Sequence, residues 1–494
     1  MKYTSTRDNS VSISSAEAIV KGISPEGGLF VPVQFPKIDG KTIEDMIDME
    51  YPQRAAFILN KYLDDFTYDE LLSYAEAAYA KFEDGDAAPV VALDDNFFIL
   101  ELWHGPTHAF KDIALTLLPY LLTAAKKKIG NDKKTLILVA TSGDTGKAAL
   151  EGFKDVDGTD IMVFYPSEGV SEMQKLQMQT QTGNNVCVGA INGNFDDAQS
   201  AVKKIFTDKD INKELADIGY ELSSANSINW GRLAPQIVYY ISAYCDLVSG
   251  GLIENGDKVN FSVPTGNFGD ILAGYYAYKM GLPVGKLIVA SNSNNVLTDF
   301  FNSGVYDIDG REFFKTMSPS MDILISSNLE RLLYHLTGDP EKVAAWMKEL
   351  KENKKFEIDL KLLEKEDIFA ADFVDDETSE TCMQNFFEVY DYALDPHTSV
   401  GMQAYNDYAY SEEDYTPTVI LSTASPYKFP SDVYRAVSKF VENDPFVAAK
   451  KLYDLSAEPI PEDILNLKTA ERRFTNVYNA DELANVVIDY VKGK

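Results

Sequence analysis

Short apolar runs recur along the chain, and most of them show no alternation of apolar and polar positions. They occupy residues 136–140, 161–165, 186–191, 259–263, 287–290 and 419–421. Each run is too short for a helix, and a run that is apolar throughout is typical of a strand buried on both faces. Most runs are followed by a loop rich in Gly, Ser, Thr or Asn and then by a helical pattern. This order predicts α/β domains built on parallel sheets.

Two polar stretches stand apart from this rhythm. Residues 364–380 and 408–416 carry runs of Asp and Glu, and such runs are usually solvated. We interpret both stretches as linkers or surface insertions. The segment from about residue 307 to 391 is predicted to be mainly helical, for example over 330–336 and 341–351.

Composition and charge narrow the classes of protein. Hydrophobic residues make up 45% of the 494 residues, so the chain can bury a core. The 45 Lys and Arg against 77 Asp and Glu give a net charge of −32, which argues against nucleic acid and against anionic lipid as partners. A small anionic substrate stays compatible with this charge, because one pocket can be locally basic.

Cysteine usage and hydropathy suggest a compartment. The 3 cysteines lie far apart and form no C-x-x-C pair, as in a reduced protein without structural zinc. Residues 1–30 lack the apolar core of a signal peptide, and no apolar stretch reaches the roughly 18 residues of a transmembrane helix. We therefore expect a cytoplasmic protein without a membrane partner.

Lys111 is the first candidate for chemistry. It lies after the Gly105-Pro106 turn, near the start of a helix predicted over 109–118. A dehydrated lysine has a lowered pKa and can act as a Schiff-base amine, whereas an exposed lysine in a first helical turn is the alternative. His104 and His108 have the spacing of a helical zinc site, but Gly105-Pro106 prevents one continuous helix between them. We expect no metal.

Four loops are further candidates, because ligands of parallel sheets bind beyond the carboxyl ends of the strands. Residues 141–147 open a helix and suit an anion, but Thr141 and Ala148 break the nucleotide-binding P-loop pattern, so we reject an NTPase. The glycines of 264–270 suit a phosphate, the hydroxyls of 421–429 suit a heteroaromatic nitrogen, and Arg232 in 223–232 suits a phosphate dianion. Taken singly, each loop could be a plain turn. Together with Lys111, they are what a pyridoxal phosphate enzyme requires.

These motifs resemble the threonine synthase family, pyridoxal phosphate enzymes of the tryptophan-synthase-β-like fold type. The resemblance covers nearly the whole chain. It includes residues 3–7 and 25–32, the lysine motif at 104–107 and 109–112, the loops 141–146, 226–232 and 266–270, and residues 395–398. One departure is Ser425, where the family usually has His.

The resemblance implies a role for each candidate residue. Lys111 would bind pyridoxal 5'-phosphate as a Schiff base, and Thr423 would face the pyridine nitrogen. Ser142, Asp144 and Thr145 would hold the amino-acid end of the substrate. For the leaving phosphate, which needs cationic and hydroxyl partners, our own candidates are Arg232 first, then Asn226, Ser227, Lys147 and Lys428. The cofactor phosphate would be cradled by Gly266, Asn267, Phe268, Gly269 and Asp270.

The resemblance also implies a domain plan. We expect two parallel-sheet α/β domains with the cofactor between them. The N-terminal segment would be 1–95, the larger cofactor-binding domain 96–134 and 215–440 with the helical insertion at about 307–391, the smaller substrate-loop domain 135–214, and a C-terminal helical segment 441–494.

The implied activity is the conversion of O-phospho-L-homoserine and water into L-threonine and phosphate by γ-elimination and β-replacement. A neutral hydroxyl at Thr423 would leave the pyridine ring unprotonated, which fits elimination and replacement better than transamination. The alternatives are a serine/threonine dehydratase-like enzyme or phospho-lyase using the same cofactor, and, from a different class, a non-catalytic binding protein.

Overall fold

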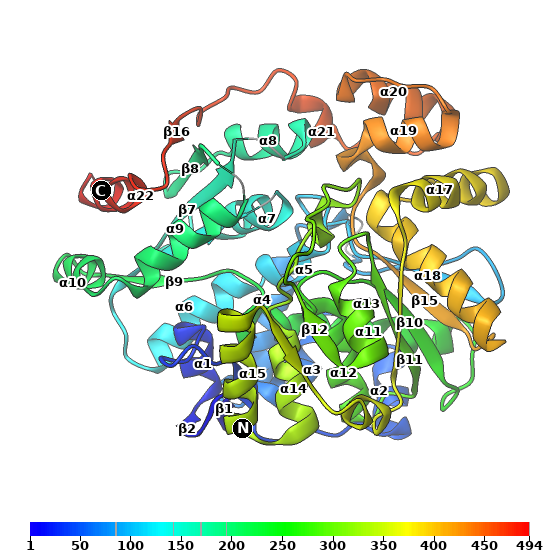
Figure 1. Cartoon of the computed structure of the whole chain (residues 1–494), viewed down its shortest axis with the longest axis horizontal. Coiled ribbons are helices and arrows are strands. Elements are labelled where there is room, and N and C mark those ends of the chain that lie inside the picture. Colours follow the sequence, from blue (N-terminus) through cyan, green and yellow to red (C-terminus); the bar gives the residue numbers. More distant parts are fainter. Residues whose placement is uncertain (84–85, 142, 168–169, 194, 494) are drawn as a thin grey trace.

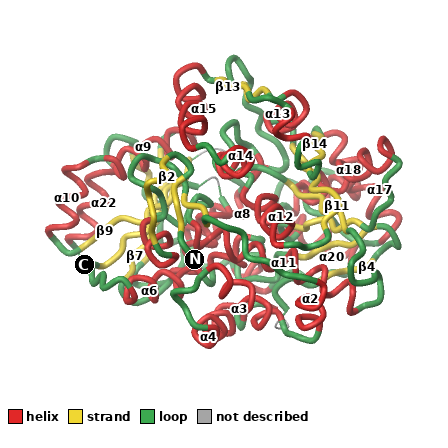
Figure 2. The backbone as a smooth tube through the Cα atoms, turned by 90° about the horizontal axis from the view of Figure 1, so that it is seen from below, coloured by secondary structure: helices red, strands yellow, loops and turns green. Residues whose placement is uncertain are grey.

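Two parallel sheets organise the molecule (Figure 1). The computed structural model describes residues 1–83, 86–141, 143–167, 170–193 and 195–493. In the view from below, the strands form two separate groups, with β7 and β9 in one and β11 and β14 in the other (Figure 2). This arrangement confirms the α/β fold predicted from the apolar runs.

The larger sheet has six strands in the order β14-β11-β10-β15-β5-β4, and only the β4–β5 pair is antiparallel. Every residue of β10, β15 and β5 is buried, as expected for strands covered on both faces. The strands are β4 (Val90–Ala92), β5 (Phe97–Glu101), β10 (Val259–Pro264), β11 (Val284–Ser291), β14 (Phe369–Phe373) and β15 (Thr418–Ser422).

The smaller sheet has five strands in the order β16-β8-β7-β6-β9, all parallel. They are β6 (Lys134–Ala140), β7 (Thr159–Pro166), β8 (Val186–Ile191), β9 (Tyr220–Ser223) and β16 (Val477–Tyr478). β9 and β16 lie outside the residues 135–214 that we assigned to the smaller domain. Figure 1 shows how the C-terminal segment crosses from the larger part of the molecule to reach this sheet.

All the apolar runs singled out in the sequence are strands, but the interpretation of the polar stretches was wrong. The stretch 364–380 contains β14, which pairs with β11 and places Ala290 opposite Asp372. β14 is an edge strand and is only partly buried, so it tolerates polar residues that hid it from the hydropathy pattern. The stretch 408–416 begins inside helix α18 (Pro396–Glu412).

Helices surround both sheets, and the remaining strands form small sheets at the periphery. The N-terminal part holds β1 (Tyr3–Ser5), β2 (Asp8–Ile13), β3 (Phe30–Pro32), α1 (Ser15–Lys21), α2 (Gly40–Ile47), α3 (Tyr51–Tyr62) and α4 (Tyr68–Tyr79). The helices that connect or follow the strands of the smaller sheet are α7 (Asp144–Phe153), α8 (Glu172–Gln179), α9 (Phe195–Thr207), α10 (Lys209–Asp217) and α22 (Leu483–Lys492). The other helices are α5 (Lys111–Leu115), α6 (Leu118–Lys128), α11 (Trp230–Ser249), α12 (Gly269–Met280), α13 (Val296–Ser303), α14 (Leu329–Thr337), α15 (Pro340–Asn353), α16 (Lys361–Glu364), α17 (Asp376–Tyr390), α18 (Pro396–Glu412), α19 (Pro430–Ser438), α20 (Pro445–Ser456) and α21 (Glu462–Asn466). Short 3₁₀ helices are η2 (Pro319–Met321) and η3 (Pro426–Lys428). The strands β12 (Val305–Asp307) and β13 (Lys355–Glu357) pair with each other.

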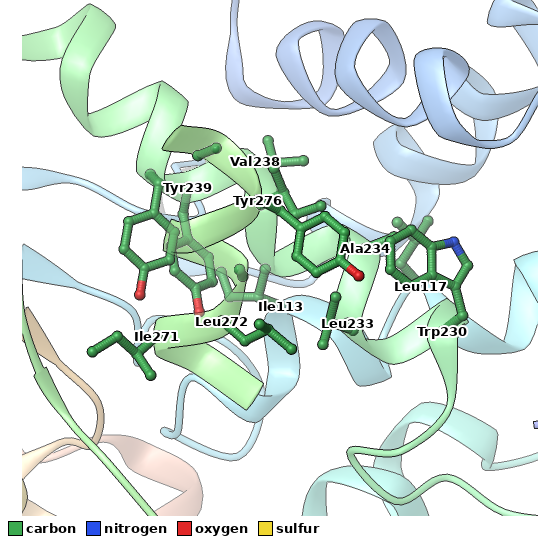
Figure 3. Close-up of a cluster of buried hydrophobic side chains, with 14 of the residues drawn as sticks. Ile113, Leu117, Trp230, Leu233, Ala234, Val238, Tyr239, Ile271, Leu272 and Tyr276 are labelled. Atoms are coloured by element: carbon green, nitrogen blue, oxygen red, sulfur yellow. The ribbon is translucent and has the colours of Figure 1, made fainter. Parts of the chain in front are cut away.

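Helix α11 is the central helix of the core. Nearly all of its residues are buried, because it is apolar on every face. Trp230 and Tyr276 pack with ring centroids 5.3 Å apart, in a cluster that joins α11 to α12 (Figure 3). This packing holds the first turns of α11 and α12 in place, and both first turns follow candidate loops. Among the described residues, no helix is long and apolar enough to cross a membrane.

Candidate active site

Lys111 is buried at the first position of α5. Its side chain lies between the two sheets' loops, with Nζ 3.8 Å from Asp144 Oδ2 and 4.5 Å from the centre of the Phe110 ring. Burial is the main cause that lowers the pKa of the Lys111 amine to about 8. The Asp144 carboxylate opposes this shift, while the cations of Arg232 and Lys428 add to it. The structure therefore gives Lys111 the dehydrated setting that a reactive amine needs.

Local hydrogen bonds explain why the lysine motif adopts this position. The Asp112 carboxylate accepts from the Thr107 backbone N–H at 2.8 Å and from its hydroxyl at 2.6 Å. A Cβ on Gly105 would lie 2.5 Å from Asp112 Cβ, so only glycine allows this close turn. The Phe110 N–H donates to the Thr423 carbonyl at 2.9 Å. The motif is thereby fixed to the loop that follows β15.

Asp144 begins α7 and is surrounded by donors from other segments. Its Oδ1 accepts from Lys428 Nζ at 2.7 Å and from Gln174 Nε2 at 2.9 Å, and its Oδ2 accepts from Ser320 Oγ at 3.1 Å. Burial alone would raise the pKa of this carboxyl, but Lys428 and Lys111 hold it well below its usual range. Asp144 is therefore an anion next to Lys111. Gln174 and Ser320 were missed by the sequence reasoning, since neither lies in a motif.

The loop after β10, residues 264–270 (the glycine loop), is held in place by residues 326–328 before α14. The carbonyl of Gly266 accepts from Ser326 Oγ at 2.8 Å, and the carbonyl of Asn267 accepts from the Asn328 N–H at 3.1 Å. Phe268 has a φ of 61° and caps α12, whose first N–H groups have no carbonyl partner within the helix. These amides form the kind of cradle that binds phosphate.

Asp270 contributes to this loop in a different way from its neighbours. Tyr239 and Tyr240 donate their hydroxyls to Asp270 Oδ1, and burial raises the pKa of the carboxyl to about 6. Oδ2 has no hydrogen-bond partner among the described residues. A phosphate would be repelled by this carboxylate, so the backbone amide is the group of Asp270 suited to bind it.

Arg232 is a buried cation without an anionic partner in the described part of the chain. Arg232 is only 4% exposed, and burial lowers the pKa of its guanidinium to about 10. Nη1 donates to the Ala225 carbonyl at 2.9 Å, Nη2 lies 3.5 Å from Thr145 Oγ1, and Nε has no partner among the described residues. A buried guanidinium of this kind fits a small anion with two or more oxygens.

The remaining candidates are distributed around these groups. Thr423 is buried and its N–H donates to Thr398 Oγ1 at 3.3 Å, whereas the Ser425 hydroxyl accepts from the Tyr427 N–H and caps η3. Ser227 borders the glycine loop, since a Cβ on Gly269 would lie 3.7 Å from Ser227 Cβ. Asn226 is half-buried and Ser142 lies outside the described residues.

Lys147 is engaged elsewhere in the structure. Its Nζ donates to Glu151 at 3.3 Å and to Gln181. The two histidines of the supposed zinc spacing also separate, because His104 contacts Glu101 and His108 contacts Asp463. The described residues contain no group of three or more side chains that could hold a metal ion.

The donor set can be tested against pyridoxal phosphate. Its aldehyde needs an unprotonated amine, and with a pKa of about 8 Lys111 has a much larger unprotonated fraction near neutral pH than an ordinary lysine. Its phosphate needs backbone amides close by, and glycines in such a loop let the backbone approach closely. A Cβ on Gly266 would lie 3.0 Å from the Ser320 carbonyl oxygen, so a larger residue would crowd this loop. The residues present therefore fit the cofactor.

Family models define the class of enzyme. A model described as "Pyridoxal-phosphate dependent enzyme" matches residues 88–423, which include the whole larger sheet, every strand of the smaller sheet except β16, and Lys111, Asp144, Arg232, residues 264–270 and Thr423. The fold and the site thus belong to a pyridoxal-phosphate-dependent enzyme. Two further models, described as "Threonine synthase N terminus" and "Threonine synthase, C-terminal", match residues 2–79 and 398–488. The chain belongs to the threonine synthase family.

Individual relatives agree with this assignment. The chain is similar to a threonine synthase from Saccharomyces cerevisiae (36% identical over 97% of this chain and 95% of the relative) and to one from Pseudomonas aeruginosa (40%, 88% and 90%). A human protein named threonine synthase-like 1 is 41% identical over 85% of this chain, which spans 58% of that longer protein.

Solved structures extend the similarity to the whole fold. A pyridoxal-phosphate-bound threonine synthase from Brucella melitensis has a TM-score of 0.87 at 35% identity, covering 100% of this chain and 99% of its own. The threonine synthase from yeast has a TM-score of 0.88 at 34% identity, with the same coverage. The similarity to these structures therefore extends over the N-terminal and C-terminal segments as well as the two sheets.

Proposed function

We propose that this enzyme converts O-phospho-L-homoserine and water into L-threonine and phosphate. The observation that carries the proposal is the buried Arg232 guanidinium, which lacks a carboxylate partner among the described residues. Its electrostatic influence extends to the Lys111 amine, and its hydrogen bond reaches Thr145. An enzyme for unphosphorylated serine or threonine would need anion sites for the cofactor phosphate and for the substrate carboxylate, but not a third site of this kind.

Substrate binding is assigned to residues at the junction of the two sheets. Arg232 binds the phosphate of the substrate, with Asn226 and Ser227 from the same loop as further donors. Thr145, Ser142 and the first amides of α7 bind the substrate carboxylate, because a helix start favours an anion. Lys428 contributes positive charge and holds Asp144, which it contacts at 2.7 Å.

The cofactor is bound by Lys111 at one end and by residues 266–270 at the other. The backbone amides of Gly266, Asn267, Phe268, Gly269 and Asp270 bind its phosphate, and the Thr423 hydroxyl bonds to the pyridine nitrogen. When bound, pyridoxal phosphate supplies a conjugated ring that stabilises negative charge at the substrate carbons.

Lys111 moves the protons. Its unprotonated amine, with a pKa of about 8, can take a proton from the substrate Cα. A second proton leaves Cβ before phosphate departs from Cγ, and protons are then returned to Cγ and Cα. Asp144 Oδ2, 3.8 Å away, stabilises the ammonium between these steps. Arg232 stabilises the phosphate as it leaves Cγ, and water then adds at Cβ.

Product analysis tests this function. The holoenzyme is incubated with O-phospho-L-homoserine, and products are followed by ¹H and ³¹P NMR. We expect threonine and phosphate in equal amounts. A keto acid and ammonia as sole products would instead identify a dehydratase-like enzyme or phospho-lyase, and the absence of turnover with bound cofactor would identify a binding protein.

A further inference from the structure

Arg331 is a second buried guanidinium and belongs to none of the sequence motifs. It is fully buried on α14, and burial lowers its pKa to about 10. Nε donates to the Phe30 carbonyl at 3.0 Å, Nη2 donates to the Ile228 carbonyl at 2.6 Å, and Nη1 donates to Asn328 Oδ1. These acceptors are all neutral, and they come from three separate segments. One cation thus joins the N-terminal strand β3, the 226–232 loop and the start of α14.

Asn328 connects Arg331 to the glycine loop by hydrogen bonds. Its Oδ1 faces Arg331, so its Nδ2 faces the other way and donates to the Asn267 carbonyl at 3.2 Å. The Asn328 backbone N–H reaches the same carbonyl at 3.1 Å. The guanidinium therefore decides which end of the Asn328 amide meets the loop, because a guanidinium only donates hydrogen bonds.

Two donors on the Asn267 carbonyl orient the peptide that follows it. A trans peptide is planar, so its N–H points away from its C=O. Fixing the Asn267 carbonyl toward Asn328 consequently turns the Phe268 N–H to the opposite side. The Ser326 hydroxyl, 2.8 Å from the Gly266 carbonyl, orients the Asn267 N–H in the same manner. The segment before α14 thereby aims successive amides of the loop.

The neighbouring residue ties α14 to the N-terminal sheet from the same side. Arg7 binds Glu330 with two hydrogen bonds, from Nε at 2.8 Å and from Nη2 at 2.7 Å. Together with the Phe30 contact of Arg331, this pair fixes α14 against β1 and β3. The N-terminal segment, which carries none of the proposed site residues, is thus connected to the glycine loop.

We propose that Arg331 is a positioning residue that aims the amides of residues 266–270 at the phosphate of the cofactor, acting through Asn328, and that couples the N-terminal segment to this end of the site. The inference rests on the proposed phosphate-binding role of that loop. A purely structural role for Arg331 would affect every ligand of the site alike, whereas aiming the loop affects only ligands that carry the phosphate.

The test compares two ligands that differ only in this group. Equilibrium binding of pyridoxal phosphate and of pyridoxal to the cofactor-free full chain is measured by absorbance for the unaltered protein and for Arg331→Met. We expect Arg331→Met to weaken pyridoxal phosphate binding about tenfold or more, while pyridoxal binding changes less than about twofold. An equal loss for both ligands, or no loss, would overturn the proposal.

A second variant covers the case in which Arg331→Met does not fold. Asn328→Asp keeps an oxygen facing Arg331 and gains an ion pair there, but it replaces the Nδ2 donor to Asn267 by an acceptor. We expect the same selective loss of pyridoxal phosphate binding in a stably folded protein, and unchanged affinity would contradict the relay. Arg54→Met is the control for removal of a buried guanidinium. Arg54 of α3 is also buried and donates to the Met46 and Ile47 carbonyls at 3.0 and 2.8 Å, and it pairs with Asp246 in the last turns of α11, away from these loops. It should change both affinities equally.

The outcomes separate this inference from the proposed reaction. If the unaltered protein bound the two ligands equally well, the phosphate role of the loop and the role of Arg331 would both be rejected. If the selective loss occurred but the unaltered enzyme formed no threonine, the reaction would be rejected and the positioning role retained.

Discussion

At the scale of single residues, burial sets the chemistry of the site. Lys111 loses proton affinity because water is excluded from its amine, and Asp144 gains acidity because two lysines lie beside it. Arg232 stays a cation but lacks an anionic partner within the described residues. None of these properties belongs to the residue type, since an exposed lysine, aspartate or arginine would have ordinary values.

The lowered pKa of Lys111 predicts a pH dependence for cofactor attachment. Only the unprotonated amine reacts with an aldehyde, so the attachment rate to the cofactor-free protein should rise with pH and level off above about 8 rather than near the ordinary value of 10.5. The rate is read from the visible absorbance of the bound cofactor.

Two variants sharpen this measurement. Asp144→Asn removes the charge that raises the pKa of Lys111, so its midpoint should move to lower pH. Lys111→Ala should keep the fold, as judged by circular dichroism, and should show neither the absorbance nor turnover. A midpoint near 10.5 in the unaltered protein would refute the buried-amine assignment.

Replacing Arg232 should affect use of the phosphorylated substrate. Arg232→Met removes charge-assisted hydrogen bonds to the substrate phosphate, and we expect kcat/KM for O-phospho-L-homoserine to fall about 10- to 100-fold. Arg232→Lys keeps the charge without the paired N–H groups and should be intermediate. Arg435→Met, at a partly exposed ion pair with Glu380, serves as the control and should leave kcat/KM unchanged. Equal values for Arg232→Met and the unaltered enzyme would exclude the assigned role.

At the scale of elements, two short helices bring the reacting charges together. α5 begins with Lys111 and α7 begins with Asp144, one on each side of the junction between the sheets. A helix start stabilises the Asp144 anion and disfavours a lysine cation, which agrees with the pKa directions of both groups. The distance between the helices is set by Gly152, since a Cβ there would lie 2.0 Å from the Leu115 carbonyl oxygen.

Gly152→Ala should therefore separate α7 from α5. The added methyl group meets backbone rather than a flexible side chain, so we expect a loss of about 1–3 kcal/mol in the free energy of unfolding and a lower kcat. Thermal unfolding and steady-state kinetics measure the two effects. Gly40→Ala is the control, because its Cβ would have 3.6 Å to the nearest atom. An unchanged Tm and kcat in Gly152→Ala would show that the helices do not need this contact.

At the scale of the whole molecule, both ends of the chain pack against elements that lie far away in the sequence. The N-terminal sheet is bound to α14 through Arg7 and Glu330, and β16 with α22 joins the smaller sheet after the chain has left it for more than two hundred residues. α22 buries Leu483, Val487, Ile488 and Val491 there. The net charge of −32 coexists with buried cations at Lys111, Arg232, Arg331 and Lys428, so an acidic protein still has positive charges for small anions in its interior.

This arrangement predicts that a change in α22 acts on one sheet. Val487 is fully buried in the same apolar cluster as Leu136 and Leu138 of β6, and Val487→Asp would place a carboxylate in that cluster. We expect faster hydrogen exchange in β6, β7 and β8, with β10 and β15 still protected. Asn485→Asp, at an exposed position of the same helix, is the control. Equal loss of protection in both sheets would mean that they unfold as one unit.

The local part of the fold was predictable because it depends on neighbours in the chain. The buried strands β6, β7, β8, β10, β11 and β15 were recognised from apolar runs, and the Gly105-Pro106 turn located Lys111 at a helix start. The edge strand β14 and the two-residue strand β16 were not recognised. Both are partly exposed, and they take their structure from pairing with β11 and β8.

The sequence by itself determined the fold class, the reactive lysine and, through its motifs, the family. Those signals are carried by hydrophobic periodicity, turn residues and short spacings, which act over a few residues. Only the tertiary structure decided that Asp144 meets Lys428, Gln174 and Ser320, that Arg232 lacks an anionic partner among the described residues, and that Arg331 orients Asn328. The physical reason is that hydrogen bonds and burial join residues up to hundreds of positions apart, and packing, not sequence spacing, sets their distances.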